Sequence, residues 1–135
     1  MTAISLNEKV KIFAREILGC GCPNSVFEVV KMQSLDKQHY KLNVGNRLLI
    51  YIVRLGDEKG LREIEKSRLQ YLRRGVAERD EYGFNRFRLV FARGSDLRIA
   101  EDKEREILNT NYDFCDGKTH VHIVDRSEID SLDLF

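Results

Sequence analysis

The chain lacks tryptophan and has only one proline and three cysteines among its 135 residues. An odd number of cysteines, without the basic and apolar start of a secretory signal, argues against a disulfide framework and favours reduced thiols in the cytoplasm. No apolar stretch approaches the roughly 18 residues that a membrane span needs. We therefore expect a cytoplasmic protein that does not contact a membrane and that requires no cofactor to fold.

A dominant charge of one sign is also missing, because 23 Lys and Arg oppose 22 Asp and Glu. The balance is uneven along the sequence: residues 62–98 hold 10 basic and 6 acidic side chains, whereas residues 99–135 hold 4 and 10. A near-neutral total does not provide the strong phosphate attraction of a dedicated nucleic-acid-binding protein. Binding of a nucleic acid or nucleotide is therefore open but not favoured.

The length and composition are those of one globular domain. Hydrophobic residues make up 42% of the chain and charged residues 33%, which excludes an intrinsically disordered chain. A domain of this size buries enough surface to fold without crosslinks or metals. We expect residues 1–135 to form a single domain, with residues 126–135 as an acidic and apolar tail that is loosely held unless it docks.

Three segments have the spacing of apolar residues that predicts helices. They are residues 6–18, residues 58–75 and a third segment that begins near Ser95 or Asp96 and includes Ile107 and Leu108. Ser5 begins the first helix with capping-box spacing, and Gly19 is expected to end it. Gly75 lies close to the expected end of the second helix.

Five segments predict strands. They are residues 26–32, 40–44, 48–53, 86–91 and 119–124, of which the first also fits a short helix. Gly45-Asn46 predicts a hairpin turn. The unbroken apolar run from Leu48 to Val53 is typical of a strand covered on both faces, whereas the alternation from Arg86 predicts a strand with one core face.

The order of these segments is helix, three strands, helix, strand, helix, strand. It predicts an α+β fold in one domain, with a mixed β-sheet of about five strands and three helices. Such a fold supports many unrelated functions, so the function must be argued from particular residues.

The first candidate site is a group of thiols. Cys20 and Cys22 flank a glycine in the loop after the first helix, and two thiolates at this spacing can bind one metal ion or cycle between a dithiol and a disulfide. Cys115 and His120 can complete a ligand set for zinc or an iron–sulfur cluster. The alternative is that the cysteines are small core residues and His120 is an ordinary strand residue.

The second candidate site is a group of arginines between residues 62 and 98. Arg73, Arg74, Arg86 and Arg88 are its proposed anion-binding members, because the planar fork of arginine suits phosphate and carboxylate groups. Acidic residues are interleaved with these arginines. The alternative is therefore a solvated surface with weak ion pairs.

The motifs of the common enzyme classes are absent, including Gly-x-Ser-x-Gly, His-Glu-x-x-His and the two glycine-rich nucleotide motifs. We therefore favour a non-enzymatic interaction or assembly module over an enzyme. Its expected partner is a second copy of the chain, bound through a sheet edge or around Leu69. Two alternatives stay open: a thiol, metal-binding or redox protein that uses Cys20-Gly21-Cys22, and phosphate, nucleotide or RNA binding through residues 62–98.

Overall fold

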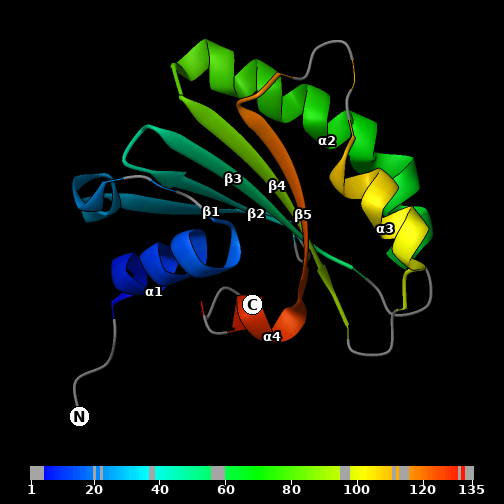
Figure 1. Cartoon of the computed structure of the whole chain (residues 1–135). Helices are drawn as coiled ribbons and strands as arrows, with labels where there is room; N and C mark the ends of the chain where they lie inside the picture. The colour runs from blue at the N-terminus through cyan, green and yellow to red at the C-terminus, as the bar shows by residue number, and fades with distance from the viewer. Residues whose placement is uncertain are drawn as a thin grey trace.

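The structure, a computed structural model, describes residues 5–19, 21, 23–36, 39–55, 60–94, 98–110, 112, 116–130 and 132. Their elements are α1 (Leu6–Ile12), the π-helical turn η1 (Phe13–Ile17), the 3-10 helix η2 (Asn24–Glu28), β1 (Val30–Asp36), β2 (His39–Val44), β3 (Leu48–Arg54), α2 (Gly60–Tyr82), β4 (Arg86–Arg93), α3 (Glu101–Leu108), β5 (Thr119–Asp125) and α4 (Arg126–Asp130) (Figure 1).

The five strands form one mixed sheet in the order β1-β2-β3-β4-β5. β2 is antiparallel to both of its neighbours, whereas β3, β4 and β5 run parallel. The predicted α+β fold with a five-stranded mixed sheet is therefore confirmed. The short helix α4 is an addition to the three predicted helices, and Ile129 on it and Leu132 after it are buried in the core.

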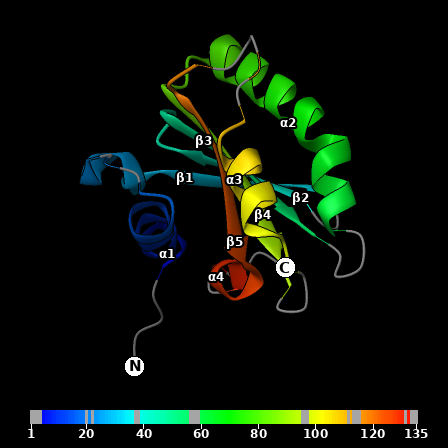
Figure 2. The ribbon, with the colours of Figure 1, turned by 45° about the vertical axis from the view of Figure 1, so that its right-hand side comes forward.

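Helices cover both faces of the sheet. α1 and α4 lie on one face, and α2 and α3 lie on the other (Figure 2). The parallel connections explain why α2 and α3 share a face, because each returns the chain to the same end of the sheet, between β3 and β4 and again between β4 and β5. The other face is covered by α1, which precedes the strands, and by α4, which follows them. We call the two sides of the sheet the α1 face and the α2 face.

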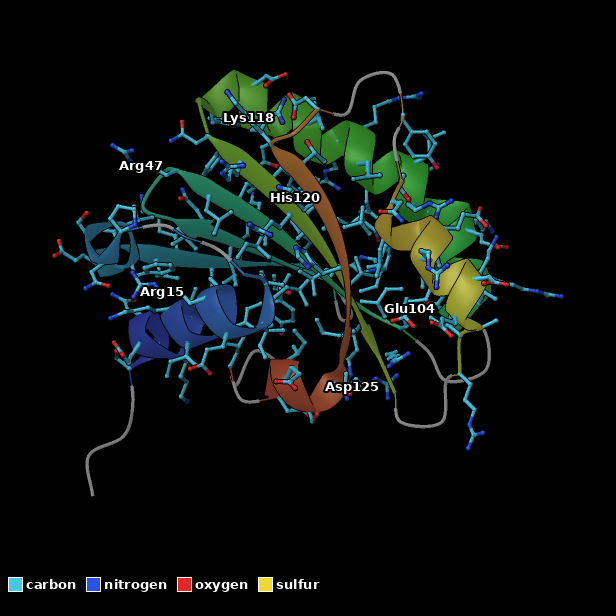
Figure 3. The ribbon with its side chains drawn as sticks, in the orientation of Figure 1. Arg15, Arg47, Glu104, Lys118, His120 and Asp125 are labelled. Atoms are coloured by element: carbon cyan, nitrogen blue, oxygen red, sulfur yellow. The ribbon has the colours of Figure 1, made fainter. Side chains whose placement is uncertain are left out.

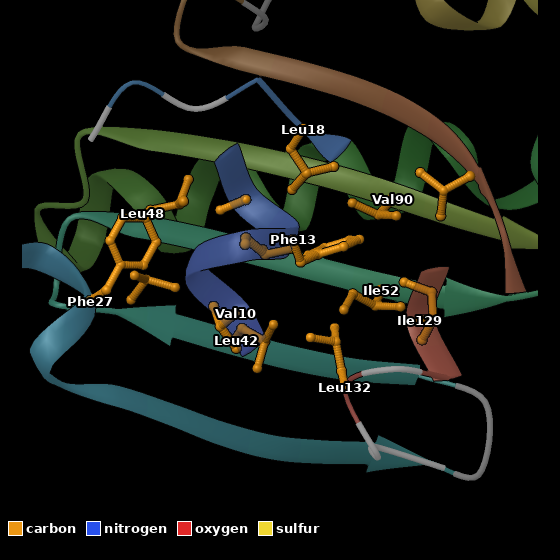
Figure 4. Packing of buried hydrophobic residues seen from close by; sticks show 14 of the residues in the cluster. Val10, Phe13, Leu18, Phe27, Leu42, Leu48, Ile52, Val90, Ile129 and Leu132 are labelled. Carbon is orange, nitrogen blue, oxygen red and sulfur yellow. The ribbon is translucent and has the colours of Figure 1, made fainter. Parts of the chain in front are cut away.

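The central strand β3 supplies both hydrophobic cores. Its residues from Leu48 to Val53 are all at most 2% exposed. Ile52 packs on the α1 face with Phe13 (Figure 4), and Ile50 belongs to the same cluster. Tyr51 and its alternate neighbours pack on the α2 face. The prediction of a strand covered on both faces is therefore correct.

The neighbouring strand β4 departs from its prediction. Its alternation predicts one core face, but the strand is buried on both faces, because its residues belong to the cores on both sides of the sheet. Phe87 is fully buried on the α2 face, and Arg88 on the α1 face is only 7% exposed. A buried arginine thus occupies a position that the sequence pattern assigns to solvent.

Three predicted boundaries are also wrong. The third helix, which we expect to begin near Ser95 or Asp96, begins at Glu101 with Ala100 as its N-cap. Residues 26–28 belong to η2, and β1 begins only at Val30, where pairing with Val44 of β2 starts. Helix α2 continues past Gly75 to Tyr82, and Gly83 ends it in the left-handed conformation with φ +73°. The predicted hairpin turn is confirmed, because Gly45 and Asn46 both have positive φ between β2 and β3.

Gly75 lies inside α2 because the helix approaches β4 closely there. A Cβ added at Gly75 would overlap the ring of Phe87. Alanine gains roughly 1 kcal/mol of helix propensity over glycine, but displacing a buried ring typically costs about 1–3 kcal/mol, and the overlap here involves three ring atoms. We expect Gly75→Ala to lower the free energy of unfolding by about 1 kcal/mol in urea denaturation.

The matched control for this prediction is Gly117→Ala, because an added Cβ at Gly117 meets no atom within 4 Å. The control should change the free energy of unfolding by less than about 0.5 kcal/mol. A Gly75→Ala protein as stable as the control would contradict the close packing of α2 on β4.

Candidate functional site

A cavity of about 460 Å³ lies at the end of the sheet where β3 and β4 begin, and we call it the arginine cavity. Its described lining residues are Gly19, Gly21, Pro23, Val26, Arg47, Asn85, Arg86 and Arg88. None of these described residues is acidic. The cavity is therefore lined by three arginines together with residues of the loop after η1, which is a composition suited to an anion.

Strand alternation places two of the arginines in the cavity. Arg86 and Arg88 are two residues apart on β4 and share the α1 face with Val90. Arg47 reaches the same place from the turn between β2 and β3. Its carbonyl oxygen accepts hydrogen bonds from the backbone N–H of Asn85 at 2.8 Å and of Arg86 at 3.2 Å, which fix the turn against the start of β4.

Arg88 is the buried member of the group. Its Nη1 donates to the carbonyl oxygen of Leu18 and lies against Nε2 of His122, each at 2.9 Å. An arginine in a protein is always protonated and can only donate, so Nε2 of His122 must accept. The geometry therefore requires a neutral His122 whose proton is on Nδ1.

The electrostatics agree with this tautomer. Burial and the nearby Arg88 guanidinium lower the pKa of His122 from 6.5 to about 4. Burial, followed by the charges of Arg88 and Arg86, also lowers the pKa of His120. Both histidines resist protonation first because they are partly buried and second because the charge of Arg88 lies nearby.

A basic rim extends from the cavity along the end of the sheet. Arg47, Lys118 and His120 lie toward this end, whereas Asp125 and Glu104 lie away from it (Figure 3). Arg15 of η1 is on the side of α1, where its guanidinium carbon is 5.4 Å from the centre of the Phe27 ring (Figure 3). The near-neutral net charge of the chain thus conceals a local separation of charge.

An ion pair between a buried arginine and an exposed aspartate holds the start of β5 in place. Arg79 of α2 is 5% exposed, and its Nη1 lies 2.8 Å from Oδ1 of Asp116 and 3.0 Å from the hydroxyl of Thr119. The hydrogen bonds from Arg79 lower the pKa of Asp116. This contact fixes the segment that carries Lys118 and the strand that carries His120.

The structure separates the four arginines that the sequence groups together. Arg86 and Arg88 line the arginine cavity, whereas Arg73 and Arg74 belong to α2 on the opposite face. Arg73 is exposed, and Arg74 lines a second cavity. Sequence reasoning also missed Arg47, whose position directly after the glycine turn was the available signal.

The second cavity, of about 780 Å³, lies between α2 and the β1–β2 hairpin. At its base, the Tyr51 hydroxyl donates to Oε1 of Glu78 at 2.5 Å, and Nζ of Lys41 lies 2.8 Å from Oε2. Burial, followed by the hydrogen bond to Glu78, raises the pKa of Tyr51, so its hydroxyl stays protonated. These bonds occupy both oxygens of a carboxylate that faces the hydrophobic core.

The thiol hypothesis falls on positions outside the described residues, because Cys20, Cys22 and Cys115 are not among them. Of the predicted ligands only His120 is described, and it pairs with Arg88 across β4 and β5. Within the described ranges, no three or more His, Cys, Asp or Glu side chains are gathered as metal ligands. The binding of zinc or an iron–sulfur cluster therefore stays a prediction.

Self-association also stays a prediction. β1 and β5 are the edge strands of the sheet, and Leu69 on α2 is half-buried. Val29 is 52% exposed just before β1, and Met32 on that strand is 45% exposed. These side chains mark the β1 edge as the more apolar of the places where a second copy can be sought.

No protein-family model, curated protein or solved structure matches this chain. We therefore infer the function from the chemistry of the two cavities described above. In the part of the chain that the structure describes, no helix has the length and apolar character to cross a membrane.

The neutral state of His122 can be measured directly by NMR titration of the histidine ring protons. We expect a midpoint near 4 for His122, because burial and Arg88 oppose its protonation. The unfolded chain then binds more protons than the folded chain between about pH 6.5 and 4, so the free energy of unfolding falls as the pH is lowered through this range.

His122→Gln provides the assignment for this titration, because its spectrum lacks the His122 resonance. The same variant should lose less stability than the parent chain between about pH 6.5 and 4. A midpoint for His122 at or above 6.5 would show that Arg88 does not hold this ring neutral.

Proposed function

We propose that this chain is a binding module for a phosphate-bearing ligand, which occupies the arginine cavity. The observation that carries the proposal is the convergence of Arg47, Arg86 and Arg88 on one cavity with no acidic side chain among its described lining residues. Guanidinium groups bind phosphate with paired, charge-assisted hydrogen bonds. The sequence favours an interaction module, and the proposal names phosphate as the chemical group that this module binds.

The burial of Arg88 supports this ligand class. The two acceptors of its Nη1, the Leu18 carbonyl and His122, are both neutral groups. A charge in a partly desolvated site interacts with an anion more strongly than an exposed arginine does. The cavity therefore favours a doubly charged phosphate group over a single carboxylate.

The neighbouring histidines favour an anion over a metal ion. Burial, followed by the charges of Arg88 and Arg86, lowers the pKa of His120, and these two arginines also oppose any other cation at the same ring. A bound phosphate reverses this field and should make both histidines easier to protonate. The arrangement thus supports anion binding more strongly than it supports a metal site that includes His120.

The test is an NMR titration of the protein with inorganic phosphate at low ionic strength. We expect saturable shifts in the amide signals of residues 85–88. The double variant Arg47→Gln, Arg86→Gln should weaken binding at least about tenfold, because each charge-assisted hydrogen bond contributes about 1.5–3 kcal/mol. Both arginines are exposed, so the fold should tolerate the change, whereas Arg88 is left in place because it also holds Leu18.

Arg73→Gln is the matched control, because Arg73 belongs to the sequence-derived group but lies on α2. It should leave the affinity for phosphate unchanged. Absence of saturable shifts in the parent chain would overturn the proposal, as would an equal loss of affinity in the Arg73→Gln control.

A further inference from the structure

The second cavity has a lining unlike that of the arginine cavity. Its described lining residues are Lys31, Met32, Gln33, Lys41, Asn43, Asn46, Arg74, Ala77, Glu78, Glu81, Tyr82 and Phe84. Amides and aromatic rings contribute alongside the charged groups. The volume of about 780 Å³ is in the range of sites for small organic groups.

The charges in this cavity are largely balanced. Glu78 is engaged by Lys41 and by the Tyr51 hydroxyl at the base. The amide groups of Asn43 and Asn46 are held in position by two hydrogen bonds between these residues, at 2.8 and 2.9 Å. Fixed amides in a cavity of balanced charge suit an uncharged ring that carries hydrogen-bonding groups.

Tyr82 provides an aromatic surface at the same cavity. It is the last residue of α2, and its side chain is 67% exposed although it is large and apolar. Phe84, two residues later, is partly buried against the α2-face core. Aromatic rings in such positions are the surfaces on which nucleic-acid bases stack.

The two cavities adjoin across the end of the sheet. Asn46 lines the second cavity, and the next residue, Arg47, lines the arginine cavity. In the same way, Phe84 lines the second cavity and Asn85 lines the arginine cavity. The hydrogen bond from the Asn85 N–H to the Arg47 carbonyl ties these two segments into one ridge. A ligand that crosses this ridge reaches both cavities.

We propose that the two cavities are the phosphate and base subsites of one binding site for a single-stranded oligonucleotide, which rests on the function proposed above. In this arrangement the sugar-phosphate backbone follows the arginines, crosses the ridge and delivers a base to the second cavity, where it stacks on Tyr82. Only a flexible strand does this, because the bases of a duplex are paired inside the helix.

The row of cations along the sheet end favours a strand with several phosphates over a single nucleotide. Arg47, Arg86 and Lys118 precede or begin three neighbouring strands, which are spaced about 4.8 Å apart. One phosphate occupies one position in this row. A chain of phosphates uses the whole row.

The test is fluorescence anisotropy with a labelled, single-stranded RNA of twelve nucleotides and mixed sequence, at several salt concentrations. Tyr82→Ala should weaken RNA binding at least about fivefold, because the stacking of one base contributes about 1–3 kcal/mol. The same variant should affect the binding of inorganic phosphate less. Lys118→Gln should reduce the slope of log affinity against log salt by about 0.7.

Leu108→Ala is the control, because Leu108 is an exposed apolar residue on α3, with 42% of its side chain accessible. It should bind the RNA as the parent chain does. If Leu108→Ala weakened RNA binding as much as Tyr82→Ala does, the assignment of the second cavity as the base subsite would be wrong.

The remaining outcomes separate the two proposals. If inorganic phosphate binds but the RNA binds no more tightly than uridine monophosphate or the RNA duplex, the single-strand inference is overturned and the phosphate proposal stands. If neither phosphate nor RNA binds, both proposals fail. Tighter binding of the single strand, weakened by Tyr82→Ala, supports the inference.

Discussion

The need to shield β3 from water on both faces determines the rest of this structure. Its six consecutive residues from Leu48 to Val53 are buried, three toward each side, so helices must pack on both faces of the sheet. A sheet enclosed in this way has no exposed central surface on which to build a site. Polar and charged groups are instead placed at the ends of the central strands and beside the outer β1–β2 hairpin, which is where both cavities occur.

The elements that could be predicted from sequence are those with local signals. The apolar run of β3, the two residues with positive φ at Gly45 and Asn46, and the order of helices and strands all depend on residues close together in the chain. The errors arise where packing between distant segments decides. Gly75 has the composition of a helix end, yet its missing side chain serves the contact with Phe87, and the helix ends eight residues later at Gly83.

The residues of the candidate site also divide into those that a local sequence pattern identifies and those that only the fold brings together. Arg86 and Arg88 have the spacing of residues that share one strand face, so their grouping could be read from sequence. Arg47 and His122 join them only through the pairing of β4 with β3 and β5, which no short-range pattern reveals. The burial of Arg88 depends on that pairing as well, because the strand pattern alone assigns its side chain to solvent.

A chain with almost no net charge can still attract phosphate, because the relevant quantity is the local field and not the total. Acidic residues of this protein are concentrated in the last third of the sequence, and Glu104 and Asp125 lie away from the basic rim (Figure 3). Asp116, which lies beside Lys118 at the rim, is paired with Arg79. Burial strengthens the attraction of Arg88 for an anion, because this arginine is only 7% exposed. Its Nη1 is bonded to the neutral carbonyl of Leu18 and to the neutral imidazole of His122. A ligand that brings negative charge to this position stabilises the folded chain by the same contacts that give it affinity, because it binds the folded state alone. In the proposed phosphate site, Arg88, which is costly to bury, is therefore the group that couples ligand binding to the stability of the fold.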